Sequence, residues 1–99
     1  MAARFRVVDT FHLESRHYFV VVGDVLEGIV RAGMEVVFPS KTFGEMRRRI
    51  FSIEFVDGIE RKAWLGLTVK YDNDEDLETL RALDLKGCEL GINDAASLH

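Results

Sequence analysis

Residues 18–38 read YFVVVGDVLEGIVRAGMEVVF, two apolar runs separated by a segment that is bounded by two glycines. The first run is rich in Val and apolar on both faces, which predicts a central β-strand over residues 18–26. Gly23 inside this run indicates a bulge or a close backbone approach. Gly28 and Gly33 bracket a short extended stretch that we interpret as a double turn, because glycine adopts positive φ without strain.

The sequence on both sides of this stretch continues the strand pattern. Apolar and polar residues alternate with the period of two that is typical of half-buried strands. Further strands are therefore expected over residues 4–13, 34–38, 46–56, 63–71 and 88–92. In the first of these, alternation places Phe5, Phe11 and Leu13 on the inward face. In the 46–56 strand it places Phe51 and Phe55 on one shared face.

Residues 74–83 are the one helical candidate. Leu77, Leu80 and Leu83 repeat at intervals of three, which favours a short amphipathic helix. The acids of residues 74–76 lie at the expected N-terminus, where the helix dipole stabilises negative charge.

Six short strands, tight turns and one short helix predict an all-β fold. A six-stranded antiparallel closed barrel is favoured over a small sandwich, because closure removes exposed strand edges. A chain of 99 residues is the size of one domain. We expect a single barrel domain over residues 1–92 and a frayed C-terminal tail over residues 93–99.

Composition excludes several classes of protein. Hydrophobic residues make up 47% of the chain and charged residues 30%, which is ordinary for a globular domain. No apolar run approaches the roughly 18 residues of a membrane span, and the first residues lack the apolar core of a signal peptide. Cys88 is the single cysteine, so no internal disulfide is expected. These features predict a cytoplasmic protein with no membrane association.

The net charge is −4, and residues 72–78 alone contribute five acids. An acidic protein is a poor candidate for general nucleic-acid binding, which is typical of a basic face. The acidic stretch lacks the glycine and the later glutamate of an EF-hand loop. We therefore interpret it as a solvated loop that precedes the helix.

The glycine-bounded stretch at residues 20–37 resembles the second domain of translational GTPases such as elongation factor Tu. Residues 7–13 are similar to the first strand of that domain, and residues 53–55 to its fourth strand. Trp64-Leu65-Gly66-Leu67 and Lys86-Gly87-Cys88-Glu89-Leu90 match two further motifs of the family. The resemblance covers about residues 5–92 and implies a six-stranded antiparallel barrel of Greek-key type.

Two departures from that family bear on function. The chain lacks a G-x-x-x-x-G-K-[ST] motif, so no nucleotide site is expected. The family's Ala-Gly-x-Asn stretch, which helps to hold the aminoacyl end of tRNA, is replaced by Arg61-Lys62-Ala63-Trp64. The tRNA-end pocket that the family implies is therefore not carried over to this chain.

Arg47, Arg48 and Arg49 form the densest charge run. One hypothesis is a phosphate-contacting patch, extended by Lys41, Arg61 and Lys62. The alternatives are a strand entry whose arginines point to both sides, and pairing with the acidic loop. Because side chains alternate along a strand, three consecutive arginines do not form a single patch.

Trp64 is the strongest single indication of an interface. Alternation places it outward beside Lys62, and exposed aromatics next to cations are enriched at interfaces. The alternative is that the N-terminus or the helix covers the indole.

The chain has few residues that could bind a metal ion or catalyse a reaction. His12, His17 and Cys88 lack the spacing of a metal site, so surface histidines and a core thiol are expected, with no metal and no cofactor. The sequence predicts a non-catalytic binding module that docks onto a protein, with weak binding to RNA or the ribosome implied by the resemblance. The alternatives are a self-associating structural barrel and, in last place, a small enzyme.

Overall fold

The structure is a computed structural model, and it describes residues 2–40, 44–59 and 62–94 of the chain. Its elements are the strands β1 (Ala3–Leu13), β2 (Tyr18–Gly28), β3 (Glu35–Ser40), β4 (Gly44–Arg49), β5 (Ser52–Ile59), β6 (Lys62–Lys70) and β7 (Glu89–Asn93), the 3-10 turn η1 (Glu14–Arg16) and the helix α1 (Asp74–Arg81). The predicted all-β fold with one short helix is confirmed. β7 runs to Asn93, so the first residue of the predicted tail lies in the sheet, whereas residues 95–99 lie outside the described residues.

The strands form one antiparallel sheet in the order β4-β3-β7-β1-β2-β6-β5. The expected closed six-stranded barrel is not found, because the described sheet has seven strands and is not closed. The predicted 46–56 strand is interrupted at Ile50 and Phe51, and its two halves, β4 and β5, lie at opposite ends of the sheet.

Backbone hydrogen bonds show how the chain passes from one end of the sheet to the other at this interruption. The Ile50 N–H donates to the carbonyl of Met34 at 2.8 Å, and the Ile50 carbonyl accepts from Gly33 N–H at 2.8 Å. One residue later, the Phe51 N–H donates to the carbonyl of Thr68 in β6 at 2.7 Å. The chain therefore leaves its contact with the β3 end of the sheet and joins β6 within two residues. Among the described residues, β4 pairs with β3 alone and β5 with β6 alone.

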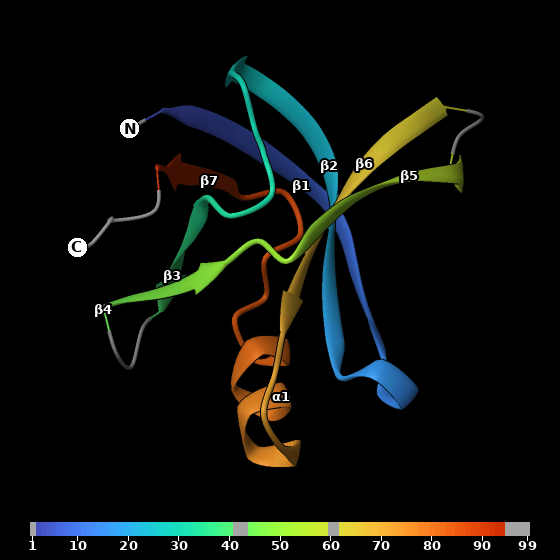
Figure 1. The fold of residues 1–99 in the computed structure, drawn as a ribbon, viewed down its shortest axis with the longest axis vertical. Coiled ribbons are helices and arrows are strands. Elements are labelled where there is room, and N and C mark those ends of the chain that lie inside the picture. Colours follow the sequence, from blue (N-terminus) through green and yellow to red (C-terminus); the bar gives the residue numbers. More distant parts are fainter. Residues whose placement is uncertain (1, 41–43, 60–61, 95–99) are drawn as a thin grey trace.

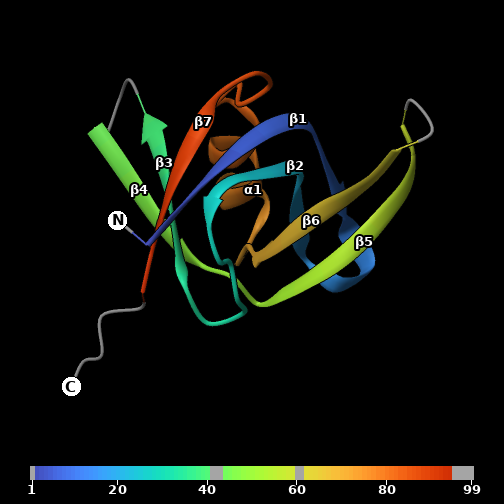
Figure 2. The same ribbon diagram turned by 90° about the horizontal axis from the view of Figure 1, so that it is seen from above.

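The sheet curves around its main core, with α1 at one end (Figures 1 and 2). The inner residues of the sheet pack with Leu77 and Leu80 of the helix in this core. The helix begins after Asn73, whose side-chain oxygen accepts a hydrogen bond from Asp76 N–H at 2.9 Å. The helix predicted over residues 74–83 is thus confirmed, and it ends at Arg81, two residues early.

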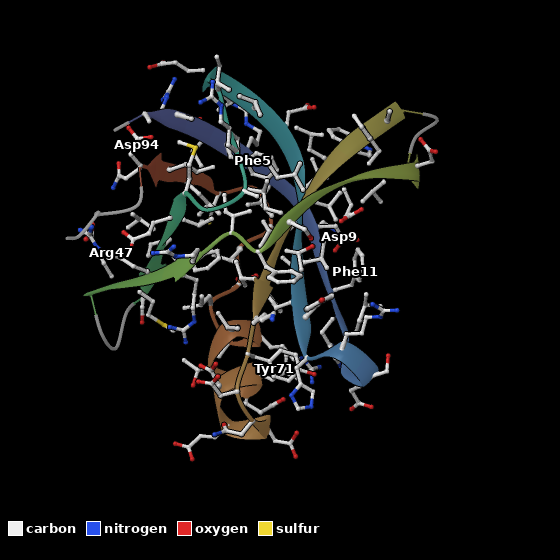
Figure 3. All side chains as sticks on the ribbon, viewed as in Figure 1. Phe5, Asp9, Phe11, Arg47, Tyr71 and Asp94 are labelled. Carbon is white, nitrogen blue, oxygen red and sulfur yellow. The ribbon has the colours of Figure 1, made fainter. Side chains whose placement is uncertain are left out.

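A bulge in β1 reverses its alternation. Val7 lies opposite Gly23 and Asp9 lies opposite Val22, so Val8 is an extra residue on β1. One inserted residue moves all later side chains to the other face of a strand. Phe11, which was expected to point inward, is therefore 41% exposed. In Figure 3, Phe5 lies among the central strands, whereas Phe11 lies at the right, outside β1.

Leu13 follows the same reversal and is 43% exposed, so its predicted inward position is also wrong. The prediction for Gly23 is confirmed, because a Cβ atom there would lie 1.8 Å from the carbonyl oxygen of Arg6. The expected positive φ is confirmed at both glycines, since Gly28 has φ 81° and Gly33 has φ 94°; a turn is found at Ala32 and Gly33, whereas Gly28 is the last residue of β2.

Candidate interaction surface on the outer face of the sheet

Strands β1, β2, β6 and β5 have an outer face that is turned away from the main core. Its floor is a second hydrophobic cluster of Val20, Val22 and Trp64. Val8, Tyr18 and Val56 pack against this cluster from three different strands. Val8 of β1 therefore belongs to the outer cluster, whereas Val7 is buried in the main core.

The expectation that Trp64 is exposed is wrong, since its side chain is only 6% exposed. Alternation does place it on the face opposite the core residue Leu67, as expected. It lies directly opposite Val56 of β5 and packs with Val20 and Val22 of β2. The indole is therefore covered by its neighbours within the sheet. The sequence had suggested the N-terminus or the helix as the cover.

Exposed apolar side chains border this cluster. Phe11 and Leu13 project from β1, and Phe51, in the interruption before β5, is 47% exposed. The Phe51 ring lies 5.3 Å from the ring of Tyr18, and the Lys70 Nζ lies 4.0 Å above its centroid. We call these five residues the outer patch.

The cross-strand register makes the outer patch continuous. Leu13 lies opposite Tyr18, which in turn lies opposite Lys70. Directly opposed residues of antiparallel strands share one face of the sheet. This surface is not apparent from the sequence, because alternation without a bulge places Phe11 and Leu13 inside. The one residue in the sequence that pointed to this surface was Gly23. It indicated a bulge, but it did not show whether the bulge lies in β2 or in the neighbouring strand.

The arginine run is not a single patch. Arg48 forms an ion pair with Asp76 of α1, which is the predicted alternative of pairing with the acidic loop. Arg47 lies 3.4 Å from Glu45 and 3.8 Å from Glu35. Arg49 is exposed at the end of β4.

The side chains of the other predicted cations, Lys41 among them, lie outside the described part of the structure. Lys62 is the first residue of β6, but its side chain is not among those described. Arg61 lies outside the described residues.

A shallow hollow of about 410 Å³ lies beside the outer patch, where η1 meets the ends of β2 and β6. It is lined by Ser15, Arg16, His17, Tyr18, Lys70, Tyr71 and Asp72. The rings of His17 and Tyr71 stack with centroids 5.1 Å apart. Burial raises the pKa of the Tyr71 hydroxyl, and the negative charges of Glu14 and Asp74 raise it further.

The described residues contain no group of three or more His, Cys, Asp or Glu side chains that could hold a metal ion. His17 is exposed and stacks on Tyr71. Cys88 is half-buried, and its Sγ lies 3.8 Å from the carbonyl oxygen of Asp84. In the part of the chain that the structure describes, no helix is long and apolar enough to cross a membrane.

Comparison with known proteins gives no relative for this chain: no family model, no curated protein and no solved structure matches it.

Proposed function

We propose that this chain is a non-catalytic binding module and that the outer patch is the surface that meets its partner. The observation that carries the proposal is the exposure of three large apolar side chains, Phe11, Leu13 and Phe51, at 41%, 43% and 47% on one face of the sheet. A contiguous exposed apolar patch rimmed by polar groups is typical of interaction sites. In the outer patch, the Tyr18 hydroxyl and the Lys70 ammonium group are the polar groups at the rim.

The proposed partner is a protein. A chain with a net charge of −4 repels the phosphate backbone of nucleic acids at long range. RNA or the ribosome is the partner implied by the resemblance to the second domain of translational GTPases. The relationship to that domain is part of the proposal, and it is supported by the positive φ of both Gly28 and Gly33.

Quantitative affinity capture from the cells that make the protein tests this function. The double variant Phe11→Ser/Leu13→Ser removes apolar area from the outer patch, and Ile29→Ser is the matched control, since Ile29 is 66% exposed outside it. A true partner is retained by the wild type and the control and is lost from the double variant.

The captured partner is then purified and titrated by calorimetry. Loss of an anchor in the outer patch is expected to weaken binding by about 2 kcal/mol or more, about thirtyfold in Kd. Capture that is equal for the wild type and the double variant would contradict the proposed surface.

A further inference from the structure

Strand β4 lies at one end of the sheet, and among the described residues it pairs with β3 alone (Figure 2). An edge strand presents backbone N–H and C=O groups that can pair with another strand. A twofold axis perpendicular to the sheet would join two copies through the same edge. The two edge strands would then be antiparallel, and the inner faces of both copies would stay on one side of the joined sheet.

We propose that two copies of this chain pair antiparallel through β4, about a twofold axis that passes between Met46 and its symmetry copy. One sheet then continues across the dimer. The inference is independent of the proposed function, because it uses a strand edge and not the outer patch.

Charge selects β4 over the other edge strand, β5. The sequence of β5 has two acids and no basic residue, so two β5 strands would bring four acids together. The three arginines of β4 are instead accompanied by three acids. Arg48 is paired with Asp76, and Arg47 lies between Glu45 and Glu35.

The backbone of β4 offers the right groups to a second β4. Ile50, the residue after β4, continues the pairing of β3 with β4, since its N–H donates to the carbonyl of Met34 at 2.8 Å. Hydrogen-bonded pairs alternate with non-hydrogen-bonded pairs along antiparallel strands. The even-numbered residues of β4 therefore direct their N–H and C=O groups to β3, whereas Glu45 and Arg47 direct theirs to the open edge.

The proposed register matches side chains on both faces. Met46 packs against the main core, so Glu45 and Arg47 point to the outer face. Across the axis, Glu45 lies opposite Arg47 of the second copy, the symmetry repeats this pair, and Met46 lies opposite its own copy. Opposite charges and apolar pairs directly across two strands are favourable. Arg48 lies opposite Gly44, which has no side chain to disturb the ion pair of Arg48 with the helix.

The other registers about such an axis are worse. An axis beside Arg47 or Glu45 places that residue opposite its own copy, so that like charges meet. An axis beside Arg48 places Arg47 opposite Arg49 of the second copy. An axis midway between two residues sets an outer residue against an inner one, which the pleat of a sheet does not allow.

The charged side chains of this register are exposed enough to make the contact. Glu45 is 62% exposed and Arg47 is 54% exposed. Arg47 has ion pairs within its own chain, with Glu45 at 3.4 Å and with Glu35 at 3.8 Å. Such exposed pairs contribute little to stability, so Arg47 can exchange partners when a second copy arrives.

This contact is isologous, because the same edge of both copies forms it. An isologous contact about a twofold axis closes at the dimer. The weight-average mass is therefore expected to rise with protein concentration to that of a dimer and no further.

Sedimentation velocity of charge-reversed variants tests the register. Glu45→Arg alone and Arg47→Glu alone should each raise the dissociation constant of the dimer about tenfold or more, because each sets like charges opposite each other in two symmetric pairs. An equimolar mixture of the two variants should regain association as a heterodimer. In that heterodimer the two altered side chains carry opposite charges and meet, and the unaltered Arg47 of the first variant meets the unaltered Glu45 of the second.

The matched control is a mixture of Glu75→Arg and Arg31→Glu, two exposed charges outside β4, and it should associate as the wild type does, alone or mixed. Thermal melts confirm that each variant is folded. A wild type that stays monomeric up to its solubility limit overturns the proposal, and so does a mixture of the β4 variants that fails to regain association.

Two further variants separate this contact from the other surfaces of the chain. Phe55→Ser alters the 82% exposed ring on β5, and Phe11→Ser/Leu13→Ser alters the outer patch. Both should dimerise as the wild type does. Loss of the dimer in Phe55→Ser would show that β5 is the joint, and loss in the double variant would show that the outer patch is. Either result overturns pairing through β4.

Amide hydrogen exchange measured by NMR tests the backbone pairing itself. The amides of Glu45 and Arg47 should exchange more slowly as the protein concentration rises through the dissociation constant of the dimer, because they become hydrogen-bonded across the axis. The amide of Met46 points to β3 in the monomer and in the dimer, so its exchange should change less. A dimer that leaves the exchange of Glu45 and Arg47 unchanged overturns the proposal.

Discussion

Arg48 of β4 is ion-paired with Asp76 of α1, and this contact ties an edge of the sheet to the helix at its end. Both side chains are partly buried, at 28% and 19% exposure. Asp76 also accepts a hydrogen bond from the backbone N–H of Asp72 at 3.1 Å. One carboxylate therefore holds the strand, the helix and the loop that leads into the helix.

Removal of either partner of this pair should destabilise the fold. We expect Arg48→Ala and Asp76→Ala each to lower the free energy of unfolding by about 1–3 kcal/mol, because the remaining charge is left partly desolvated. A double-mutant cycle from urea unfolding gives the coupling. The exposed pair of Arg81 and Glu78, 3.0 Å apart, is the control, with an expected coupling below about 0.5 kcal/mol.

Trp64 should behave as a core residue. Because it is 6% exposed within the second cluster, Trp64→Ala is expected to cost about 3–5 kcal/mol of stability. Ile29→Ala, at a side chain that is 66% exposed, should change stability by about 0.5 kcal/mol or less. A melting temperature that Trp64→Ala leaves unchanged would contradict the burial of the indole and restore it as a surface anchor.

Gly28 and Gly33 both have positive φ but differ in their surroundings. A Cβ atom at Gly28 would lie 2.1 Å from the carbonyl oxygen of Ala2, whereas at Gly33 nothing lies within 4 Å. Gly33→Ala should therefore cost about 1–2 kcal/mol from backbone strain alone. Gly28→Ala should cost more, because the chain at Ala2 must also move. Equal losses in thermal melts of the two variants would show that the close approach is absent.

Much of the fold could be predicted because its causes are local. The helix could be read from the Leu77, Leu80 and Leu83 spacing and the acids before it, and the turns from Gly28 and Gly33. The bulge at Val8 could not be placed, because it is defined by the pairing with another strand, in which Val7 lies opposite Gly23 and Asp9 opposite Val22. Alternation alone carries no sign of an inserted residue, so every side chain after it was assigned to the wrong face.

The interruption at Ile50 and Phe51 was missed for a similar reason. Residues 46–56 keep a strand-like composition throughout, and their division depends on which distant backbone each half meets. The backbone of Ile50 forms hydrogen bonds with Met34, and that of Phe51 with Thr68. These two partners lie toward opposite ends of the strand order. The outer patch could not be predicted for the same cause, since it needs both the bulge and the interruption to bring Phe11 and Phe51 to one face.

RNA binding should be weak. A fluorescence titration with single-stranded RNA is expected to give a Kd no better than the roughly 10⁻⁴–10⁻⁶ M of non-specific contacts, and affinity should fall steeply as salt rises. The arginine run supports this expectation, since Arg47 and Arg48 are both ion-paired with acids of the same chain. Tight binding that persists at high salt would make RNA the partner in place of a protein.

Tyr71 should make the fold sensitive to alkaline pH. The residue is 4% exposed, and burial, followed by the charges of Glu14 and Asp74, raises the pKa of its hydroxyl above the ordinary value of 10.0. In the unfolded chain the hydroxyl ionises at its ordinary pKa, whereas in the folded chain it stays protonated to higher pH. The stabilisation is thus fully present below pH 10.0 and is lost as pH rises through the folded pKa.

Urea unfolding between about pH 9 and about pH 11 measures this loss against the other groups that titrate there, chiefly lysines. Tyr71→Phe keeps the stacked ring beside His17 but has no ionisable hydroxyl, so its stability should decline less over this range than that of the wild type. Tyr18→Phe retains Tyr71 and should decline as the wild type does. Parallel declines for the wild type and Tyr71→Phe would show that the hydroxyl is ionised as easily in the folded chain as in the unfolded one.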